Sequence, residues 1–130
     1  MSYTSFEYSN LVINKNAVDE LEYTVTVDVK NVGQILGQES VQLYVRDLES
    51  RLPRPYQELK AFDKVALEPG ETKQVVLQLN KHAFKYWDDQ EEGSWVVEKG
   101  EFEIAIASSS IDIRLTDMLH VQHDLKWRGL

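Results

Sequence analysis

Polar and apolar residues alternate with a period of two along most of the chain. In residues 22–29, EYTVTVDV, one set of alternate positions holds Tyr23, Val25, Val27 and Val29, and the other set is polar. Because successive side chains of a β-strand point to opposite faces, this pattern predicts a strand with one buried face. The same alternation predicts strands in SVQLYVR, ELKAFDKVAL, TKQVVLQL, EFEIAIA and IDIRL.

Several apolar side chains of these segments are expected to point inward. We expect Leu59 and Phe62 to belong to the core, and Trp95 as well because it shares a face with Val97. Of the neighbours Tyr86 and Trp87, one should point in and one out. The last segment should alternate in the same way at Ile111, Ile113 and Leu115.

Turn signals separate the expected strands at steady intervals. Pro69 and Gly70 predict a tight turn, and Asn80 is a typical N-cap for a single helical turn at residues 80–84. Residues 85–97 predict a hairpin. Near the start, the alternation changes phase between residues 8 and 11, which indicates a bulge or a strand that bends between sheets.

Seven to eight short strands with no long amphipathic helix predict an all-β fold. The steady spacing of strands and turns is typical of an antiparallel β-sandwich of immunoglobulin-like or fibronectin type III-like build. The chain of 130 residues is the size of one domain. Asn31, Gly33 and Gly37 are expected to act as turn formers between two of the strands.

Composition narrows the classes of function. Charged residues make up 28% of the chain and the net charge is −8, which disfavours binding to nucleic acid or to an anionic membrane. No apolar run approaches the roughly 20 residues that span a bilayer, and no signal peptide is expected from the N-terminus. The chain has no cysteine, which excludes disulfides and zinc sites built on sulfur.

Candidate catalytic and metal-binding groups do not form a convincing site. Four carboxylates, at positions 88, 89, 91 and 92, lie at the expected hairpin tip. Solvation there would keep their pKa values alike, whereas a glycosidase needs two carboxyl groups with different pKa values. The histidines at positions 82, 120 and 123 form no metal motif, and Ser108–Ser110 lack a nucleophile elbow. We therefore expect no catalytic residue, metal or cofactor in this chain.

Residues 46–62, RDLESRLPRPYQELKAF, interrupt the strand pattern with a stiff, charged connection. Two prolines hold it extended, and four basic residues outnumber three acidic ones, so it is positive within an acidic chain. A basic, partly apolar strip on an acidic domain indicates a docking surface. The residues expected to carry it are Arg46, Arg51, Pro53, Arg54, Pro55, Tyr56 and Lys60.

Several long motifs in order resemble one known family. VQLYVRD, RPYQELKAFDKV, LEPGETKQVVLQL and WDDQEEGSWVVEKGEFEIAIASSS are similar to the C-terminal fibronectin type III-like domain of family 3 glycoside hydrolases, the β-glucosidase group. The resemblance covers residues 2–116, with Ala61 and Ala107 where the family usually has glycine. It predicts a sandwich domain at residues 1–116 and leaves residues 117–130 as a C-terminal tail or extension.

The resemblance implies an accessory role. The resemblance implies that the nucleophilic aspartate of the parent enzyme lies in a barrel domain. The acid/base carboxylate of this family usually comes from an α/β domain. The resemblance therefore carries over no catalytic residue and implies an excised, non-catalytic domain that braces the catalytic domains of a parent glycosidase and shapes its active-site mouth. The alternatives are a carbohydrate-binding module, which needs exposed coplanar aromatic rings, and a free-standing interaction domain.

Overall fold

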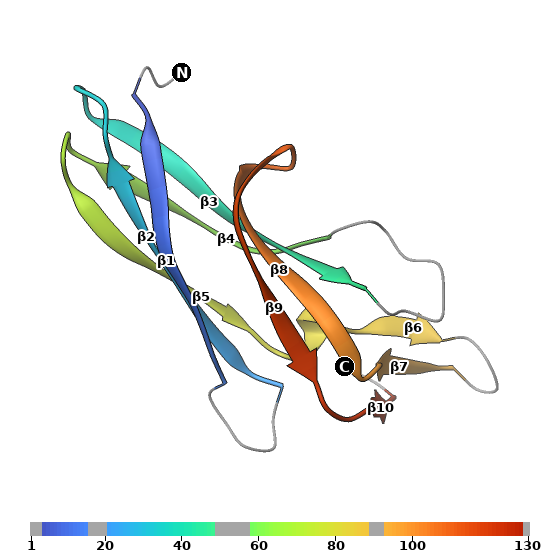
Figure 1. The fold of residues 1–130 in the computed structure, drawn as a ribbon. Helices are drawn as coiled ribbons and strands as arrows, with labels where there is room; N and C mark the ends of the chain where they lie inside the picture. The colour runs from blue at the N-terminus through green and yellow to red at the C-terminus, as the bar shows by residue number, and fades with distance from the viewer. Residues whose placement is uncertain (1–3, 16–20, 49–57, 89–92, 129–130) are drawn as a thin grey trace.

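The computed structural model describes residues 4–15, 21–48, 58–88 and 93–128. Figure 1 shows an elongated all-β molecule. Its elements are β1 (Phe6–Lys15), β2 (Tyr23–Asn31), β3 (Gly37–Asp47), β4 (Glu58–Leu67), β5 (Thr72–Leu79), the 3-10 turn η1 (Lys81–Ala83), β6 (Tyr86–Asp88), β7 (Ser94–Val97), β8 (Gly100–Ser109), β9 (Asp112–Val121) and β10 (Leu125–Trp127). Within these ranges, no helix is long and apolar enough to cross a membrane.

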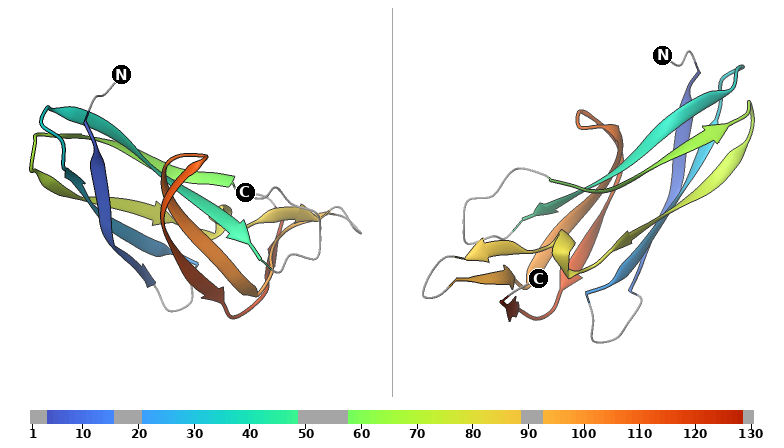
Figure 2. Two further views of the ribbon diagram at one scale, coloured as in Figure 1. Left: turned by 45° about the horizontal axis from the view of Figure 1, so that its top comes forward. Right: turned by 180° about the vertical axis from the view of Figure 1, so that it is seen from behind.

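Two main sheets form the sandwich, and a small sheet extends from one end. The strand orders are β1-β2-β5, β4-β3-β8-β9 and β10-β7-β6, and all the pairings among the described residues are antiparallel. Both views in Figure 2 keep β6 and β7 at the end opposite the β4–β5 turn. The predicted antiparallel sandwich is confirmed. The described part has ten strands rather than seven or eight, because three short strands make the additional sheet.

The core lies between the inner faces of the two main sheets. Val25, Val27 and Val29 of β2 are fully buried, and so are the inward residues of β8, among them Phe102 and Ile104. These side chains belong to one continuous cluster. Full burial of such a side chain stabilises the fold by roughly 1.5–3 kcal/mol, so the apolar positions of the period-two pattern contribute to the stability of the sandwich.

The prediction that Leu59 and Phe62 belong to the core is wrong. They are 47% and 61% exposed. The register of β4 against β3 shifts between Leu43 and Tyr44, which leaves Lys60 as the extra residue of a bulge. Because of this extra residue, two side chains three positions apart both point outward, and the inward positions of β4 include Ala61 and Leu67.

Two other predicted core positions also differ from the structure. Trp95 is only half-buried, because the small sheet carries it away from the main sandwich. Ile111 is 93% exposed at the β8–β9 turn, and Leu115 rather than Ile113 packs against the core. Of the pair Tyr86 and Trp87, the first is buried and the second exposed, as expected.

The segment that the resemblance left unassigned contributes to the fold. Residues 117–121 continue β9, and Leu119 and Val121 are buried in the core. Residues 125–127 form β10, which pairs with β7. These pairings place the last described strand in the small sheet.

The turn predicted at Pro69 and Gly70, the cap at Asn80 and the bulge of β1 are confirmed, whereas Asn31 and Gly37, predicted as turn formers, are the last residue of β2 and the first of β3. The register of β1 against β2 shifts between Ser9 and Val12. Within this bulge Asn10 adopts a φ of 55°, which asparagine tolerates better than most residues. Asn80 caps η1 by accepting a hydrogen bond from the His82 N–H. Gly70 has a φ of 80° in the β4–β5 turn.

Candidate docking surface

The seven residues predicted for docking divide into two groups. Arg46 near the end of β3 and Lys60 in the bulge of β4 are described by the structure. Arg51, Pro53, Arg54, Pro55 and Tyr56 lie outside the described residues, so their part in docking stays a prediction. β3 pairs with β4 as far as Val45 and Glu58, and with β8 as far as Asp47, so the connection leaves the sheet after Asp47 and re-enters it at Glu58.

Both described cations have acidic partners within the domain. Arg46 forms an ion pair with Glu103, its cross-strand neighbour on β8. The Lys60 Nζ lies 3.2 Å from the Glu58 Oε2, and the Lys60 side chain is largely covered. Since each positive charge already faces a carboxylate, these two residues offer a partner little net charge.

Apolar side chains flank the same connection. Leu48 is exposed at the end of β3, where its N–H donates to the Glu101 carbonyl at 3.1 Å. Leu59 and Phe62 are exposed on β4. The described borders of the predicted docking segment are therefore more apolar than basic, which the sequence pattern did not reveal because the bulge at Lys60 has no local signature.

The three tryptophans of the chain form one cross-strand row in the small sheet. Trp95 on β7 lies opposite Trp87 on β6 and Trp127 on β10. Trp87 is 48% exposed. The centroids of the Trp87 and Trp95 rings are 5.0 Å apart, and the ring planes make an angle of 73°. The Lys85 Nζ lies 4.0 Å from the centroid of the Trp95 ring. The pair of rings is therefore edge-to-face, with an ammonium group over one of them, rather than a flat platform.

Residues 39–110 match the sequence profile of a known family, the fibronectin type III-like domain. The chain belongs to this family. The match covers β3 and β8, which form the centre of the four-stranded sheet described above.

Most of the similar proteins that we compared are β-glucosidases of much greater length, and one is a putative β-xylosidase of Formosa agariphila. The domain is 48% identical to the thermostable β-glucosidase B of Acetivibrio thermocellus, over 98% of this chain and 17% of that protein. It is 43% identical to a β-glucosidase of Kluyveromyces marxianus, over 100% of this chain and 15% of that protein. The fibronectin type III-like domain thus spans about one sixth of the length of the curated relatives it matches.

Solved structures of β-glucosidases contain the same fold. The K. marxianus β-glucosidase in complex with glucose has a TM-score of 0.89 at 40% identity, over 100% of this chain and 15% of that one. The β-glucosidase 3B of Thermotoga neapolitana in complex with α-D-glucose also has a TM-score of 0.89, at 33% identity, over 99% of this chain and 17% of that one. The similarity extends over the small sheet and the strands beyond residue 116.

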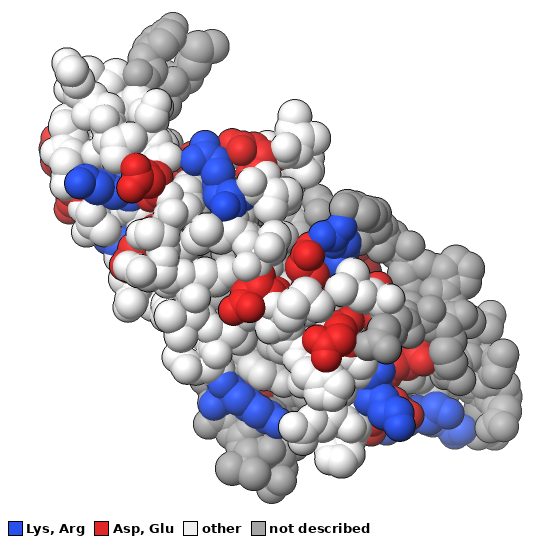
Figure 3. Space-filling view, in the orientation of Figure 1, with Lys and Arg blue, Asp and Glu red and all other residues white. Residues whose placement is uncertain are grey.

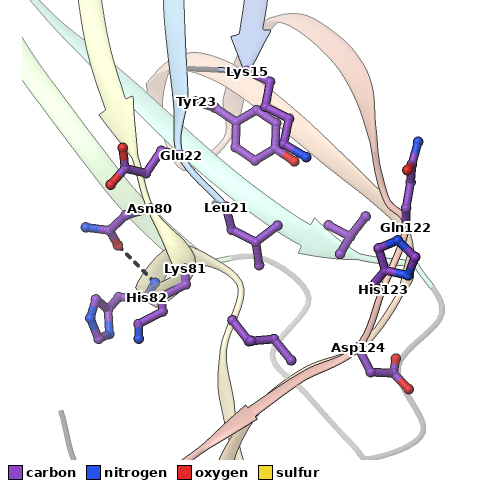
Figure 4. A pocket seen from close by; sticks show the side chains of 12 residues that line it. Lys15, Leu21, Glu22, Tyr23, Asn80, Lys81, His82, Gln122, His123 and Asp124 are labelled. Atoms are coloured by element: carbon purple, nitrogen blue, oxygen red, sulfur yellow. Dashed lines mark hydrogen bonds between the residues drawn. The ribbon is translucent and has the colours of Figure 1, made fainter. Parts of the chain in front are cut away.

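An open pocket of about 790 Å³ lies at one end of the fibronectin type III-like domain, beside η1 and the β9–β10 turn. Figure 4 shows Leu21, His82 and Asp124 around it, contributed by three separate segments. Partial desolvation lowers the pKa of His82, with Lys85 and Lys81 adding to the effect. Acidic and basic residues both line the pocket, so its charge favours no single class of ligand.

Charges on the visible face of the domain are mixed. Basic and acidic side chains are interspersed in Figure 3 and are separated by uncharged surface. Among the described residues, no group of three or more His, Cys, Asp or Glu side chains is placed to hold a metal ion.

Proposed function

We propose that this fibronectin type III-like domain is a non-catalytic accessory domain of a family 3 β-glucosidase-like glycoside hydrolase. One observation carries the proposal. At 48% identity, 98% of this chain aligns with only 17% of the length of a β-glucosidase. In a parent enzyme that hydrolyses O-glycosyl bonds, the domain would brace the catalytic domains and contribute to the shape of the active-site mouth.

The sandwich is physically suited to bracing. Its core is continuous from β2 and β5 to β3 and β8, so the domain presents fixed surfaces. A rigid surface loses little conformational entropy on docking, which leaves more of the contact energy for the interface. The segment with Pro53, Arg54 and Pro55 would act in the same way, because proline restricts the free chain.

A hybrid enzyme tests the proposal. In the A. thermocellus β-glucosidase B, this chain replaces the matching segment, and the comparison is the same enzyme truncated before that segment. We expect the hybrid to hydrolyse a nitrophenyl glucoside and to inactivate at a higher temperature than the truncated enzyme, and the chain alone to hydrolyse nothing. Equal inactivation temperatures for the hybrid and the truncated enzyme would contradict the bracing role.

The contribution of residues 46–60 can be separated in the same hybrid. Arg54→Glu is expected to lower the inactivation temperature, because it reverses a charge in the proposed contact. Lys30→Glu makes the same charge change at an exposed position of β2 and serves as the control. Equal effects of the two substitutions would place the contact elsewhere on the domain.

Direct binding of polysaccharide is less well supported. Stacking of sugar rings needs exposed aromatic faces in one plane, and the Trp87 and Trp95 planes differ by 73°. The Lys81 Nζ also lies 4.3 Å from the centroid of the Trp127 ring. The geometry of the tryptophan row therefore favours a structural role for these side chains.

A further inference from the structure

The outward side of the four-stranded sheet carries an apolar surface, which we call the outer face. Its first cross-strand row contains Phe62, Gln42, Ala107 and Ile113. Its second row contains Leu59, Tyr44, Ala105 and Thr116, and Met118 follows on β9 opposite Glu103. Residues directly opposite one another on paired strands share a face, so these side chains form one surface.

The centre of the outer face is already packed. Tyr44, Ala105 and Ala107 are buried and form a cluster of their own, separate from the main core. The Tyr44 hydroxyl donates to the Gln42 Oε1 at 2.6 Å, which satisfies the polar end of the ring. A buried apolar cluster on the side of a sheet that faces away from the core is the first sign that this side is not simply a solvated surface.

Large apolar side chains stand exposed around this centre. Phe62 is 61% and Leu59 47% exposed on β4, and Met118 and Ile113 are exposed on β9. A single exposed apolar residue is ordinary, but a contiguous apolar patch marks an interaction site. The patch spans all four strands of the sheet.

Two side-chain pairs lie on the polar border of the outer face. Arg46 contacts Glu103, and the His120 Nδ1 lies 2.6 Å from the Glu101 Oε1. A polar rim around an apolar centre is the anatomy of a protein–protein interface.

The other main sheet differs at the equivalent place. On the outward side of β1-β2-β5, the Thr24 hydroxyl donates to the Gln78 Oε1 at 3.0 Å, and the Asn10 amide donates to the Asp28 carboxylate at 2.8 Å. Such a polar side is what an antiparallel sheet shows to water. That side also exposes Val12 and Val76, but the larger exposed apolar side chains Phe62, Leu59 and Met118 lie on the four-stranded sheet.

We propose that the outer face docks on the catalytic portion of the parent glycosidase, which covers Phe62 and Leu59. This inference rests on the proposed function. The occupant follows from length, because the matched relatives extend far beyond the segment that this chain matches, at 17% and 15% of their lengths. A well-packed apolar patch of another domain is the partner that fits an apolar centre with a polar rim.

The hybrid enzyme tests the outer face directly. The double substitution Phe62→Asp with Leu59→Asp places two carboxylates in the contact and is expected to remove the gain in inactivation temperature that the hybrid has over the truncated enzyme. Val76→Asp is the matched control, because Val76 is also 47% exposed but lies on β5 of the other sheet. It should leave the gain intact.

The possible results distinguish a failure of the proposed accessory function from a failure of the docking of the outer face. A hybrid no more stable than the truncated enzyme overturns the proposed function. A stabilised hybrid that is indifferent to the double substitution overturns only the docking of the outer face. A double variant that falls to the level of the truncated enzyme while Val76→Asp does not supports it.

Two measurements on the 130-residue chain complete the test. The double substitution should leave the thermal unfolding midpoint, followed by circular dichroism, unchanged. A fall in that midpoint equal to the loss in the hybrid would show that the outer face acts within the domain and would overturn the inference. Light scattering should find a monomer, and a dimer that the double substitution dissociates would identify a second copy as the occupant instead.

Discussion

The two main sheets are alike on the inside and different on the outside. Both bury a regular row of apolar side chains, such as Val27 on β2 and Ile104 on β8. Outside, the three-stranded sheet is mostly polar and exposes only the smaller Val12 and Val76 among its described large apolar side chains, whereas the four-stranded sheet carries Phe62 and a buried Tyr44. The core between the inner faces does not include the exposed side chains of the outer face, so their apolar character calls for a reason other than core packing.

This contrast separates two uses of the same apolar chemistry. Inner side chains lose their water when the chain folds, so their burial contributes to the stability of the domain. The exposed side chains of the outer face keep their water until a partner covers them, so their burial would contribute to association. Substitutions should therefore have large effects on folding at one set of positions and small effects at the other.

The largest expected effect compares two phenylalanines of the four-stranded sheet. Phe102 is fully buried, with its ring centroid 5.0 Å from that of Phe84, and Phe62 is mostly exposed. We expect Phe102→Ala to lower the free energy of unfolding by about 3–5 kcal/mol, and Phe62→Ala to change it by no more than roughly 0.5 kcal/mol. Urea unfolding measures both. Similar losses would mean that the outer face is packed within the domain, and the contrast between inside and outside would fail.

Sequence reasoning reached the inner faces because they depend on local alternation. The valines of β2 and the inward residues of β8 follow that alternation without interruption, so their strands and their burial were both predictable. Leu59 and Phe62 were not, because the bulge at Lys60 depends on pairing with β3, and such a register is set by the partner strand.

The tryptophan row and the role of Asn31 were missed for related reasons. The row appears only when the hairpin register and the return of β10 are known, and β10 is distant in sequence from β6. Asparagine is a typical turn former, yet Asn31 is fully buried at the end of β2. Its role depends on which carbonyl groups of another sheet lie beside it. For the docking residues between 49 and 57, the expectation stays a prediction.

A smaller effect is expected at Asn31, which joins the two sheets. Its amide donates to the Leu67 carbonyl at the end of β4 at 2.9 Å and to the Ile35 carbonyl at 2.8 Å, and its oxygen accepts from the Gly33 N–H. Asn31→Ala leaves buried backbone groups without these partners, so we expect a loss of about 1–3 kcal/mol in the free energy of unfolding.

The exposed Asn14 on β1 provides the control for this joint. Asn14→Ala should change the free energy of unfolding by no more than roughly 0.5 kcal/mol, since its surroundings are open to water. Urea unfolding of both variants would decide the matter. If Asn31→Ala were as mild as the control, the sheets would be held together by apolar packing alone.

The smallest expected effect concerns a second joint between the sheets, where β1 meets β3 and β9. Here the Arg114 guanidinium donates to the Phe6 carbonyl at 2.9 Å and pairs with Asp112. Burial raises the pKa of Glu39 on β3 above its ordinary value of 4.5, against the opposing effects of Tyr8 and Arg114. The folded protein therefore holds this proton more tightly than the unfolded chain does.

The sign of the pH dependence follows from that difference. As pH rises from 4.5 through the raised pKa, Glu39 must ionise at a cost that only the folded state bears, so its contribution makes the protein less stable. Glu39→Gln removes the charge, and the variant should gain stability over the wild type near pH 7 and lose that advantage below pH 4.5. Urea unfolding of both proteins between pH 4.5 and pH 7 measures this difference in the free energy of unfolding. Glu7→Gln on β1 changes the net charge equally, and the same pH profile in both variants would assign the effect to the overall charge of −8 rather than to the joint between the sheets.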